Sequence, residues 1–478
     1  MRTAVIALVL AWCATAAADG PPPTNPSRFE TVIVPPETLA HETAGVLYLN
    51  RCKGGCTITR SGINDARSHS SSIPRSDSGQ TQFAMTEFSW GDDEWNQIVQ
   101  CVKEVYSPYA LTVTDEMPVP GTLYNEAIIA GSDHEIGVSA GGIAPSANDC
   151  NPYSYIISYT FANDYPNPNG RVFLLCAVAA QESGHAYGLD HTYSFSDGSS
   201  GCKDPMTYRN DCGGQKFFRN DPATCGEYGP RPCRCGATQN SHLKLIGVLG
   251  SGTPITSPPV VSLTSPMDGA IIAAGSSVIA IAGAQRGIAA VELWLNDYKW
   301  ATLPGVEFGA AGQPEAAYSL AIPSEVPDGV IDVVVKAKDD IDVATETAPI
   351  TVTKGLPCTS SDTCLLGQVC DARGRCLWEP PAGQLGEACT FPQFCLTGMC
   401  EGDETTKVCT QVCVPGVADS CPDGFHCLDE GRVCWPGDED GGGGGGCSSA
   451  NRSVPPYALL GIAVLALLGF RRRRSARP

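Results

Sequence analysis

The chain has 478 residues and a formal net charge of −20, with 51 acidic against 31 basic side chains. So acidic a protein is poorly suited to bind nucleic acid or an anionic lipid surface, and we expect no nucleic-acid partner. The length is sufficient for several domains, and changes in composition along the chain indicate where they divide.

Residues 1–18 have the pattern of a secretory signal peptide. Met1-Arg2 precedes the apolar run Ala4–Trp12, and the small residues Ala16–Ala18 form a cleavage site before Asp19. Cys13 lies inside this segment, but the bulky Trp12 before it argues against a lipoprotein signal. We therefore expect ordinary export and cleavage after Ala18.

Residues 28–250 form the first predicted domain, which we expect to be of the α+β class. Alternating apolar residues predict strands, and apolar residues at helical spacing predict helices. In chain order the predictions are a strand over Val46–Asn50, a helix over Glu94–Tyr106, strands over Ala110–Thr114, Glu126–Ala130 and Tyr153–Phe161, and helices over Val172–Leu189 and Ser241–Leu249. The segment Cys202–Cys235 has five cysteines and little periodicity, which predicts a lobe held by disulfides.

The most informative segment lies at the end of the second predicted helix. Residues 181–191 are Gln-Glu-Ser-Gly-His-Ala-Tyr-Gly-Leu-Asp-His, and Asp-Pro-Met-Thr-Tyr follows at 204–208. Gln181 and His185 are four residues apart and share one face of a helix, with Glu182 beside them. Gly188 can end the helix with a positive φ, and the turn then brings His191 back toward the same point.

This pattern resembles the metzincin zinc metalloproteases, whose motif is H-E-x-x-H-x-x-G-x-x-H followed by a Met-turn. The resemblance implies a metzincin-like catalytic domain over residues 28–250, with Zn²⁺ bound by His185 and His191. It also implies that Glu182 is the general base that takes a proton from the metal-bound water, in an endopeptidase that acts on protein or peptide substrates. Met206 would form the floor beneath the metal, and Tyr208 would support the oxyanion or touch the metal.

The motif departs from the family at Gln181, which stands where the first histidine ligand belongs. A glutamine carbonyl oxygen is a weaker donor than an imidazole, and catalytic zinc normally has three protein ligands. Gln181 either coordinates zinc in a weakened site, or another group such as His134 completes the shell, or the site is empty. Two functions remain open: a surface endopeptidase, and a catalytically inactive metzincin-fold protein that acts in binding or adhesion.

Two acidic residues of the motif also have a plain structural interpretation. Glu182 is either the general base or an ordinary carboxylate on the surface of the helix. Asp190 either orients a metal ligand through a hydrogen bond or is a surface aspartate.

Residues 251–259 form a linker rich in Ser, Thr and Pro, and residues 260–354 then change in character. They contain no cysteine or histidine, and turn signals separate their short alternating runs. The runs are Val260–Leu263, Val278–Ala282, Ala290–Leu295, Ile331–Ala337 and Ile350–Val352. This pattern resembles the bacterial Ig-like β-sandwich modules and implies a spacer or binding module.

The cysteine distribution predicts an oxidising compartment. Of the 24 cysteines, ten lie between Cys52 and Cys235 and twelve between Cys358 and Cys434. Two even sets predict two separately closed groups of disulfides. Cys52 with Cys56, and Cys233 with Cys235, could alternatively form zinc pairs. The twelve cysteines of residues 358–434 form three sets of four, which predicts a stiff stalk of small disulfide-rich units.

The C-terminal end resembles the sorting signals called MYXO-CTERM. Residues 435–453 contain the glycine run Gly441–Gly446 and Cys447, and residues 454–478 contain the apolar span Val454–Phe470 before Arg471–Arg474. The resemblance implies cleavage near Cys447, a lipid on that cysteine, and a place at the cell surface or outer membrane. An uncleaved transmembrane anchor remains the alternative, with the arginines on the cytoplasmic side.

Overall fold

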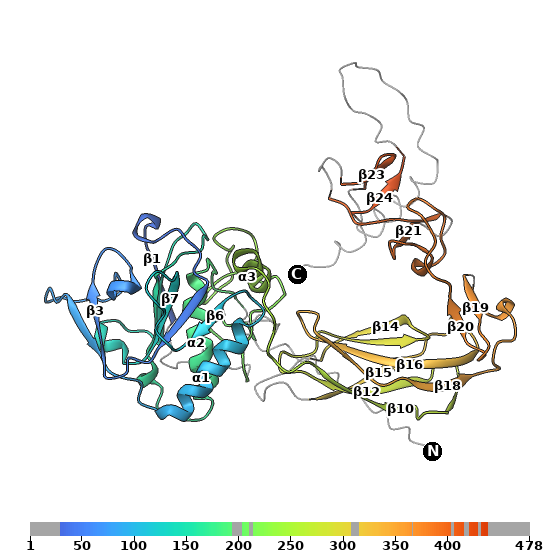
Figure 1. Cartoon of the computed structure of the whole chain (residues 1–478), viewed down its shortest axis with the longest axis horizontal. Helices are drawn as coiled ribbons and strands as arrows, with labels where there is room; N and C mark the ends of the chain where they lie inside the picture. Colours follow the sequence, from blue (N-terminus) through green and yellow to red (C-terminus); the bar gives the residue numbers. More distant parts are fainter. Residues whose placement is uncertain are drawn as a thin grey trace, which may run out of the picture. The chain divides into compact units, whose positions relative to one another are not determined.

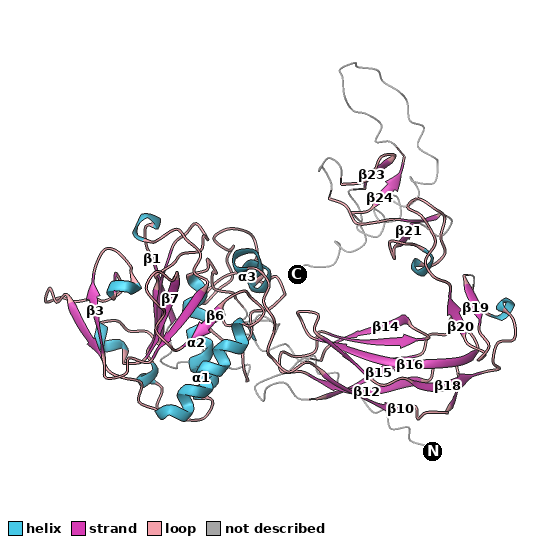
Figure 2. Cartoon of the chain, in the orientation of Figure 1, coloured by secondary structure: helices cyan, strands magenta, loops and turns pink. Residues whose placement is uncertain are grey.

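The computed structural model describes residues 29–193, 203–209, 214–306, 315–365, 367–402, 406–414, 420–428 and 432–437. Most regular structure in these ranges is β-strand, with three α-helices (Figures 1 and 2). The chain divides into two compact units, residues 1–377 and residues 378–478. Each unit is described by itself below.

A six-stranded sheet forms the centre of the first domain. Its strand order is β1-β8-β9-β7-β2-β6, and neighbours run parallel except for the antiparallel pair β8 and β9. The strands are β1 (Phe29–Ile33), β2 (Val46–Asn50), β6 (Thr112–Thr114), β7 (Tyr124–Ile129), β8 (Gly142–Ser146) and β9 (Ile157–Thr160).

Side chains that alternate along the strands fill two cores, one on each face of the sheet. On β2, Leu47 and Leu49 enter the core shared with helices α1 (Gly91–Tyr106) and α2 (Arg171–His185), while Tyr48 enters the opposite core. The opposite face is covered by a small sheet of β3 (Cys56–Arg60), β4 (Ser70–Ser71) and β5 (Gln82–Met85). The domain is therefore layered, with both helices on one side (Figure 1).

Helices α1 and α2 are tied together covalently and electrostatically. Cys101 of α1 and Cys176 of α2 form a disulfide. At the start of α2, Arg171 donates from Nε to Glu94 Oε2 at 2.7 Å, and its guanidinium lies 3.9 Å from the ring centre of Trp90. These contacts fix the helix that carries the motif.

Most predicted elements of the first domain are present. The strand Val46–Asn50 and the helix Ser241–Leu249 (α3) have the predicted bounds. The motif helix α2 ends at His185 instead of Leu189, because the chain turns through Gly188 at φ +81°. Strands β1, β3, β4, β5 and β8 were not predicted. They are at most five residues long, and β8 is buried at every position and therefore shows no alternation.

Residues 260–354 form a two-sheet β-sandwich, as predicted. One sheet contains β10 (Val260–Ser265), β12 (Ser277–Gly283) and β15 (Ala316–Ala321). The other contains β11 (Ile271–Ile272), β13 (Ala290–Leu295), β14 (Tyr298–Pro304), β16 (Gly329–Lys338), β17 (Ala344–Glu346) and β18 (Ile350–Lys354). A single apolar core contains side chains from both sheets, including Val278, Leu320, Leu293 and Val335.

The cysteine-rich region consists of three units that share one pairing, first cysteine to third and second to fourth. The disulfides are Cys358–Cys370, Cys364–Cys376, Cys389–Cys400, Cys395–Cys409, Cys413–Cys427 and Cys421–Cys434. Each unit has a two-stranded ribbon: β19 (Gln368–Cys370) with β20 (Cys376–Trp378), β21 (Cys400–Gly402) with β22 (Lys407–Cys409), and β23 (Phe425–Cys427) with β24 (Cys434–Pro436).

The first of these three units packs on the sandwich. The N–H of Val330 on β16 donates to the carbonyl of Gly374 at 2.9 Å, and Arg375 pairs with Asp332 at 2.5 Å. The first four-cysteine repeat therefore belongs to the compact part of the chain formed by residues 1–377, together with the sandwich. The second and third repeats belong to residues 378–478.

The alternative of zinc-binding cysteine pairs is wrong. Cys52 and Cys56 form a disulfide with each other, Cys233 pairs with Cys225, and Cys235 pairs with Cys150. Sulfur atoms in disulfides carry no thiolate, which is the form that binds zinc.

Several predicted segments lie outside the described residues. They are the signal peptide 1–18, the cysteines 202 and 212, the Gly-rich segment with Cys447, and the apolar span 454–470. Within the described ranges, no helix combines the length and the apolar character that a membrane span requires.

Glu126 on β7 offers a test of the core opposite the helices. The side chain is fully buried, and its Oε1 accepts a hydrogen bond from Asn50 Nδ2 at 2.6 Å. Burial raises the pKa of Glu126 above its usual 4.5, against the opposing effect of His69. The folded protein therefore holds this proton more tightly than the unfolded chain, and stability falls as pH rises from about 4.5 through the raised pKa.

We expect the variant Glu126→Gln to lack this decrease in stability with rising pH, because its amide does not titrate. Its unfolding free energy should match that of the wild type near pH 4 and exceed it increasingly toward pH 8, measured by urea denaturation across that range. A constant difference at every pH would contradict the burial of a titrating carboxyl group here.

Candidate metal centre

Helix α2 places the predicted site residues inside the protein. The helix is buried along most of its length, and Gln181, Glu182 and His185 are 1%, 0% and 1% exposed. Glu182 is thus not a carboxylate on the surface of the helix. A fully buried acid and two buried polar neighbours need partners or a ligand, because burial of an unsatisfied polar group is costly.

The turn after α2 folds the chain back tightly. Gly188 has φ +81°, and a Cβ atom on it would lie 2.2 Å from the carbonyl oxygen of Cys150. Only glycine fits both the backbone conformation and the space. This turn returns His191 to the end of the helix, where its ring centre lies 4.6 Å from that of His185.

The two imidazoles converge on one point through their Nε2 atoms, which are 3.0 Å apart. His185 Nδ1 lies 2.8 Å from the carbonyl oxygen of Leu189, and His191 Nδ1 lies 3.0 Å from Glu227 Oε1. Both oxygens only accept, so each Nδ1 carries the proton and each Nε2 presents a lone pair. Two lone pairs that face each other at this distance repel unless a cation or a proton lies between them.

The environment favours neutral imidazoles. Burial lowers the pKa of His185 well below its usual 6.5, and the neighbouring His191 lowers it further. Burial also lowers the pKa of His191, although its hydrogen bond to Glu227 opposes this shift. Neutral imidazole with a free Nε2 lone pair is the form that binds a metal ion.

An ion network behind His191, in which Asp190 is buried and Glu227 and Arg231 are partly exposed, holds Glu227 in place. Arg231 donates to Glu227 Oε1 at 2.6 Å and to both oxygens of Asp190 at 2.7 and 2.8 Å. Burial of Asp190 would raise its pKa, but the hydrogen bond from Arg231 and the charge of Arg234 hold it at about 2. Asp190 is 1% exposed, so its interpretation as a surface aspartate is wrong, and it supports the site through Arg231.

Tyr208 lies against His191, and Met206 lies beside helix α2 and the residue that follows His191. Met206 is fully buried, and its Sδ atom would be 3.0 Å from a Cβ atom placed on Gly184 of α2. The carbonyl of Met206 accepts a hydrogen bond from the N–H of Thr192 at 3.0 Å. The ring of Tyr208 packs on His191 with ring centres 4.6 Å apart. The structure thus brings both predicted turn residues beside the helix and its returning loop.

The residues present fit a divalent cation such as zinc. Among the described residues, both carboxylate oxygens of Glu182 and the Nε2 atom of Gln181 lack hydrogen-bond partners although they are buried. Burial raises the pKa of Glu182 well above its usual value. Two facing imidazole lone pairs are donors of the kind that binds zinc, and Gln181 and Glu182 lie on the same helix as His185.

His134 is not a replacement ligand of this buried set. It lies in the 3₁₀ helix η3 (Asp133–Ile136), its side chain is 78% exposed, and its Nδ1 is 3.8 Å from Asp133. With Asp133 and Asp164 it forms a cluster outside the core.

Glu227 and Arg231 were not predicted as site residues. They follow the motif by about forty residues, and no periodicity or spacing links them to it. The disulfide between Cys225 and Cys233 closes the loop that carries them, and this closure depends on a pairing that the sequence leaves open.

No known protein family model and no curated protein matches the chain. Among solved structures, the fibronectin(III)-like modules of Clostridium thermocellum CbhA are 15% identical over 20% of this chain and 96% of theirs, with a TM-score of 0.16. OgpA from Akkermansia muciniphila is 15% identical over 49% of this chain and 64% of its own, with a TM-score of 0.14. The SrpA adhesin of Streptococcus sanguinis is 18% identical over 21% of this chain and 56% of its own, with a TM-score of 0.13. Likenesses this weak support no assignment.

The turn at Gly188 can be tested against a matched glycine. Gly170 also has a positive φ, +72°, but a Cβ atom there would meet nothing within 4 Å. We expect Gly170→Ala to cost about 1 kcal/mol of unfolding free energy through backbone strain alone. Gly188→Ala should cost about 1–3 kcal/mol more, because its methyl group collides with the backbone at Cys150. Equal losses in urea denaturation would contradict the close approach.

The second test concerns the acid behind His191. Because Glu227 fixes the proton on Nδ1, Glu227→Ala should weaken zinc binding by about 10–100-fold, measured by competition with a chelating dye. Glu325→Ala, on the exposed surface of the sandwich, is the control and should leave zinc affinity unchanged. An unaltered affinity in Glu227→Ala would show that the hydrogen bond does not orient a metal ligand.

Proposed function

We propose that residues 28–250 form a metzincin-like zinc-dependent endopeptidase domain with a weakened metal site, carried by an exported protein of the cell surface. One observation supports this most strongly. The Nε2 lone pairs of His185 and His191 face one point, 3.0 Å apart, at the end of the helix that also carries Glu182, whose buried carboxyl group has no hydrogen-bond partner among the described residues. A scaffold without chemistry has no need for this costly arrangement.

His185 and His191 would hold the zinc ion, and the amide oxygen of Gln181 would be a third, weaker donor from the preceding turn of α2. The oxygen and nitrogen of this amide are exchangeable by rotation of the side chain, so its unpartnered end can present either atom. When bound, zinc would supply Lewis acidity that polarises a peptide carbonyl and makes water more acidic.

Glu182 would move the proton. Its carboxyl group is fully buried, and a raised pKa makes a carboxylate a stronger base toward water. It would accept a proton from the attacking water and pass it to the leaving amine. Tyr208, packed on the ring of His191, would donate its phenol proton in a hydrogen bond to the oxyanion.

The ends of the chain support the cellular placement in this proposal. The signal peptide pattern at residues 1–18 favours export, and the ten disulfides in the described residues require an oxidising environment. The C-terminal pattern favours attachment to the membrane through residues 454–478 or through a lipid on Cys447.

The test is zinc content and turnover of the purified full chain, with casein and a mixed peptide library as substrates. We expect bound zinc and measurable peptide cleavage. Glu182→Gln keeps the size and hydrogen-bonding capacity of the side chain but removes the base, so it should lower kcat by about 100-fold or more with zinc still bound.

Gln181→His supplies an imidazole in place of the weak amide donor and should raise zinc affinity at least tenfold. Gln97→His places a histidine on the exposed face of α1 and controls for adventitious binding. Absence of both zinc and turnover in the wild type, with a fold unchanged by chelators, would reject the enzyme in favour of a binding or adhesion protein. An unchanged affinity in Gln181→His would remove Gln181 from the ligand set.

A further inference from the structure

We propose that Arg286 and Asp340 of the sandwich are positioning residues for the candidate metal centre. They would hold the segment 203–209, which carries Met206 and Tyr208, against the end of helix α2. The sandwich would then be a structural part of the site and not a spacer. The geometric part of this inference is independent of the proposed enzymatic function, and only its zinc-affinity readout rests on it.

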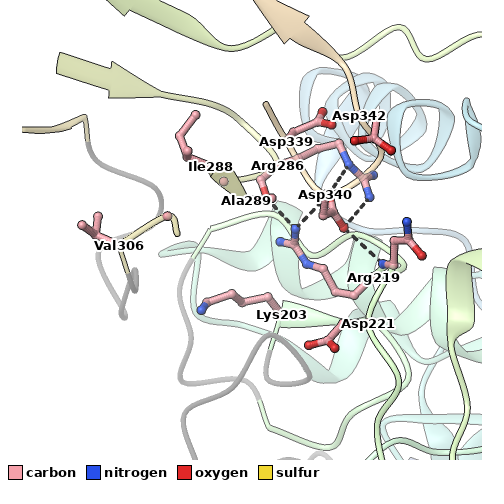
Figure 3. Close-up of a pocket in the computed structure, with 13 residues that line it drawn as sticks. Lys203, Arg219, Asp221, Arg286, Ile288, Ala289, Val306, Asp339, Asp340 and Asp342 are labelled. Atoms are coloured by element: carbon pink, nitrogen blue, oxygen red, sulfur yellow. Dashed lines mark hydrogen bonds and ion pairs between the residues drawn. The ribbon is translucent and has the colours of Figure 1, made fainter. Parts of the chain in front are cut away.

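Arg286 is buried between the sandwich and the first domain, with 1% of its surface exposed. It donates from Nε to Asp340 Oδ1 at 2.9 Å and from Nη2 to Asp340 Oδ2 at 3.1 Å. The same Nη2 donates to the carbonyl of Phe218 at 3.0 Å, and the guanidinium lies 4.8 Å from the ring centre of Phe217. Figure 3 shows this cluster. Arg286 and Asp340 line a cavity of about 350 Å³.

Arg219 of the first domain completes the cluster around Asp340. Its Nη1 lies 3.5 Å from Asp340 Oδ1 and donates to the carbonyl of Arg286 (Figure 3). The N–H of Asn220 donates to Asp340 Oδ2 at 3.3 Å. Asp340 therefore pairs with both buried guanidiniums, and Asp204 adds a further attraction to Arg219. Burial would raise the pKa of Asp340, but Arg219 and Arg286 hold it below its usual value.

The backbone of Arg219 connects this cluster to the segment that carries Met206. Its N–H donates to Asp204 Oδ2 at 2.9 Å, and Asp204 Oδ1 accepts from the N–H of Met206 at 2.9 Å. The N–H of Phe217 also donates to the carbonyl of Lys203 at 3.0 Å. The Asp204 side chain thus joins segment 203–206 to segment 217–219. Segment 217–219 is also the one that contacts the sandwich.

A second contact anchors the sandwich to helix α1. Gln285 Nε2 donates to Glu104 Oε2 at 2.6 Å and to Gln215 Oε1 at 3.1 Å. Gln215 in turn donates to the carbonyl of Cys101, the residue that links α1 to α2 by a disulfide. The loop at residues 285–286 therefore contacts both the segment 215–218 and helix α1.

Loss of the Asp340 charge would remove the acid that pairs with both buried guanidiniums, so the segment 217–219 should separate from the sandwich. The simpler interpretation is that the interface only joins two domains and leaves the site unaffected. The two interpretations differ at residues 203–209, which the proposal loosens and the simpler interpretation does not.

The experiment compares Asp340→Asn with Glu346→Gln in the full chain. Glu346 on β17 is 59% exposed and pairs with Lys336, so its variant removes one sandwich carboxylate away from the cluster. We expect Asp340→Asn to speed amide hydrogen exchange at residues 203–209 and 217–220 at least tenfold and to weaken zinc binding at least fivefold. Glu346→Gln should change neither, and Asp340→Glu, which keeps the charge, should restore most of both.

Exchange in β13 and β16 reports whether the sandwich itself stays folded. If Asp340→Asn unfolds the sandwich, the variant Arg286→Lys is used instead. It keeps the positive charge but loses the two hydrogen bonds from Arg286 to Asp340. Faster exchange confined to residues 285–289 and 338–342 would overturn the proposal. Because hydrogen exchange needs no metal, a wild type without zinc or activity would reject the proposed function and still leave the positioning role tested.

Discussion

The two facing nitrogen lone pairs of His185 and His191 are the constraint on which this site depends. Each imidazole has its other nitrogen occupied, one by the backbone carbonyl of Leu189 and one by the carboxylate of Glu227. The protein therefore fixes both tautomers and aims two electron pairs at one point inside its core. Such an arrangement is unfavourable by itself, and a cation at that point turns the repulsion into binding.

The polar groups around the two histidines differ in whether they have hydrogen-bond partners. Arg231 links Glu227 to Asp190, so the acid behind His191 is itself paired and stays ionised. On the other side, Glu182 remains fully buried and without a partner among the described residues. The groups that hold the two imidazoles are thus themselves paired, whereas the carboxyl group of Glu182 has no partner among the described residues, and the function we propose would make use of both.

The sandwich contacts the first domain close to the segment that carries Met206. Its loops at Arg286 and Asp340 reach the chain just after the predicted Met-turn, and the contacts are charged, buried and continuous with Asp204. A module appended only as a spacer needs no buried arginine at its boundary. The disulfide between Cys101 and Cys176 and the contact of Gln285 with Glu104 join the same boundary to the motif helix.

Local pattern predicted much of the first domain and of the sandwich. The strand Val46–Asn50, the helix Ser241–Leu249 and the strand Ala290–Leu295 have the bounds that apolar periodicity indicated. The spacing of His185 and His191 also sufficed to predict that they meet, because helix geometry and a single glycine turn determine it. Strands such as β8 were missed because they are buried on both faces and show no alternation.

By itself, then, the sequence determined many of the regular elements, the convergence of the motif histidines and the presence of disulfides, since these depend on short-range geometry and on residue counts. Only the tertiary structure decided which groups stand behind the ligands. Glu227 reaches His191 across a disulfide-closed loop, and Asp340 reaches Arg219 across a domain boundary. Contacts between residues so far apart in the chain depend on how the elements pack, and that packing leaves no periodic signal in the sequence.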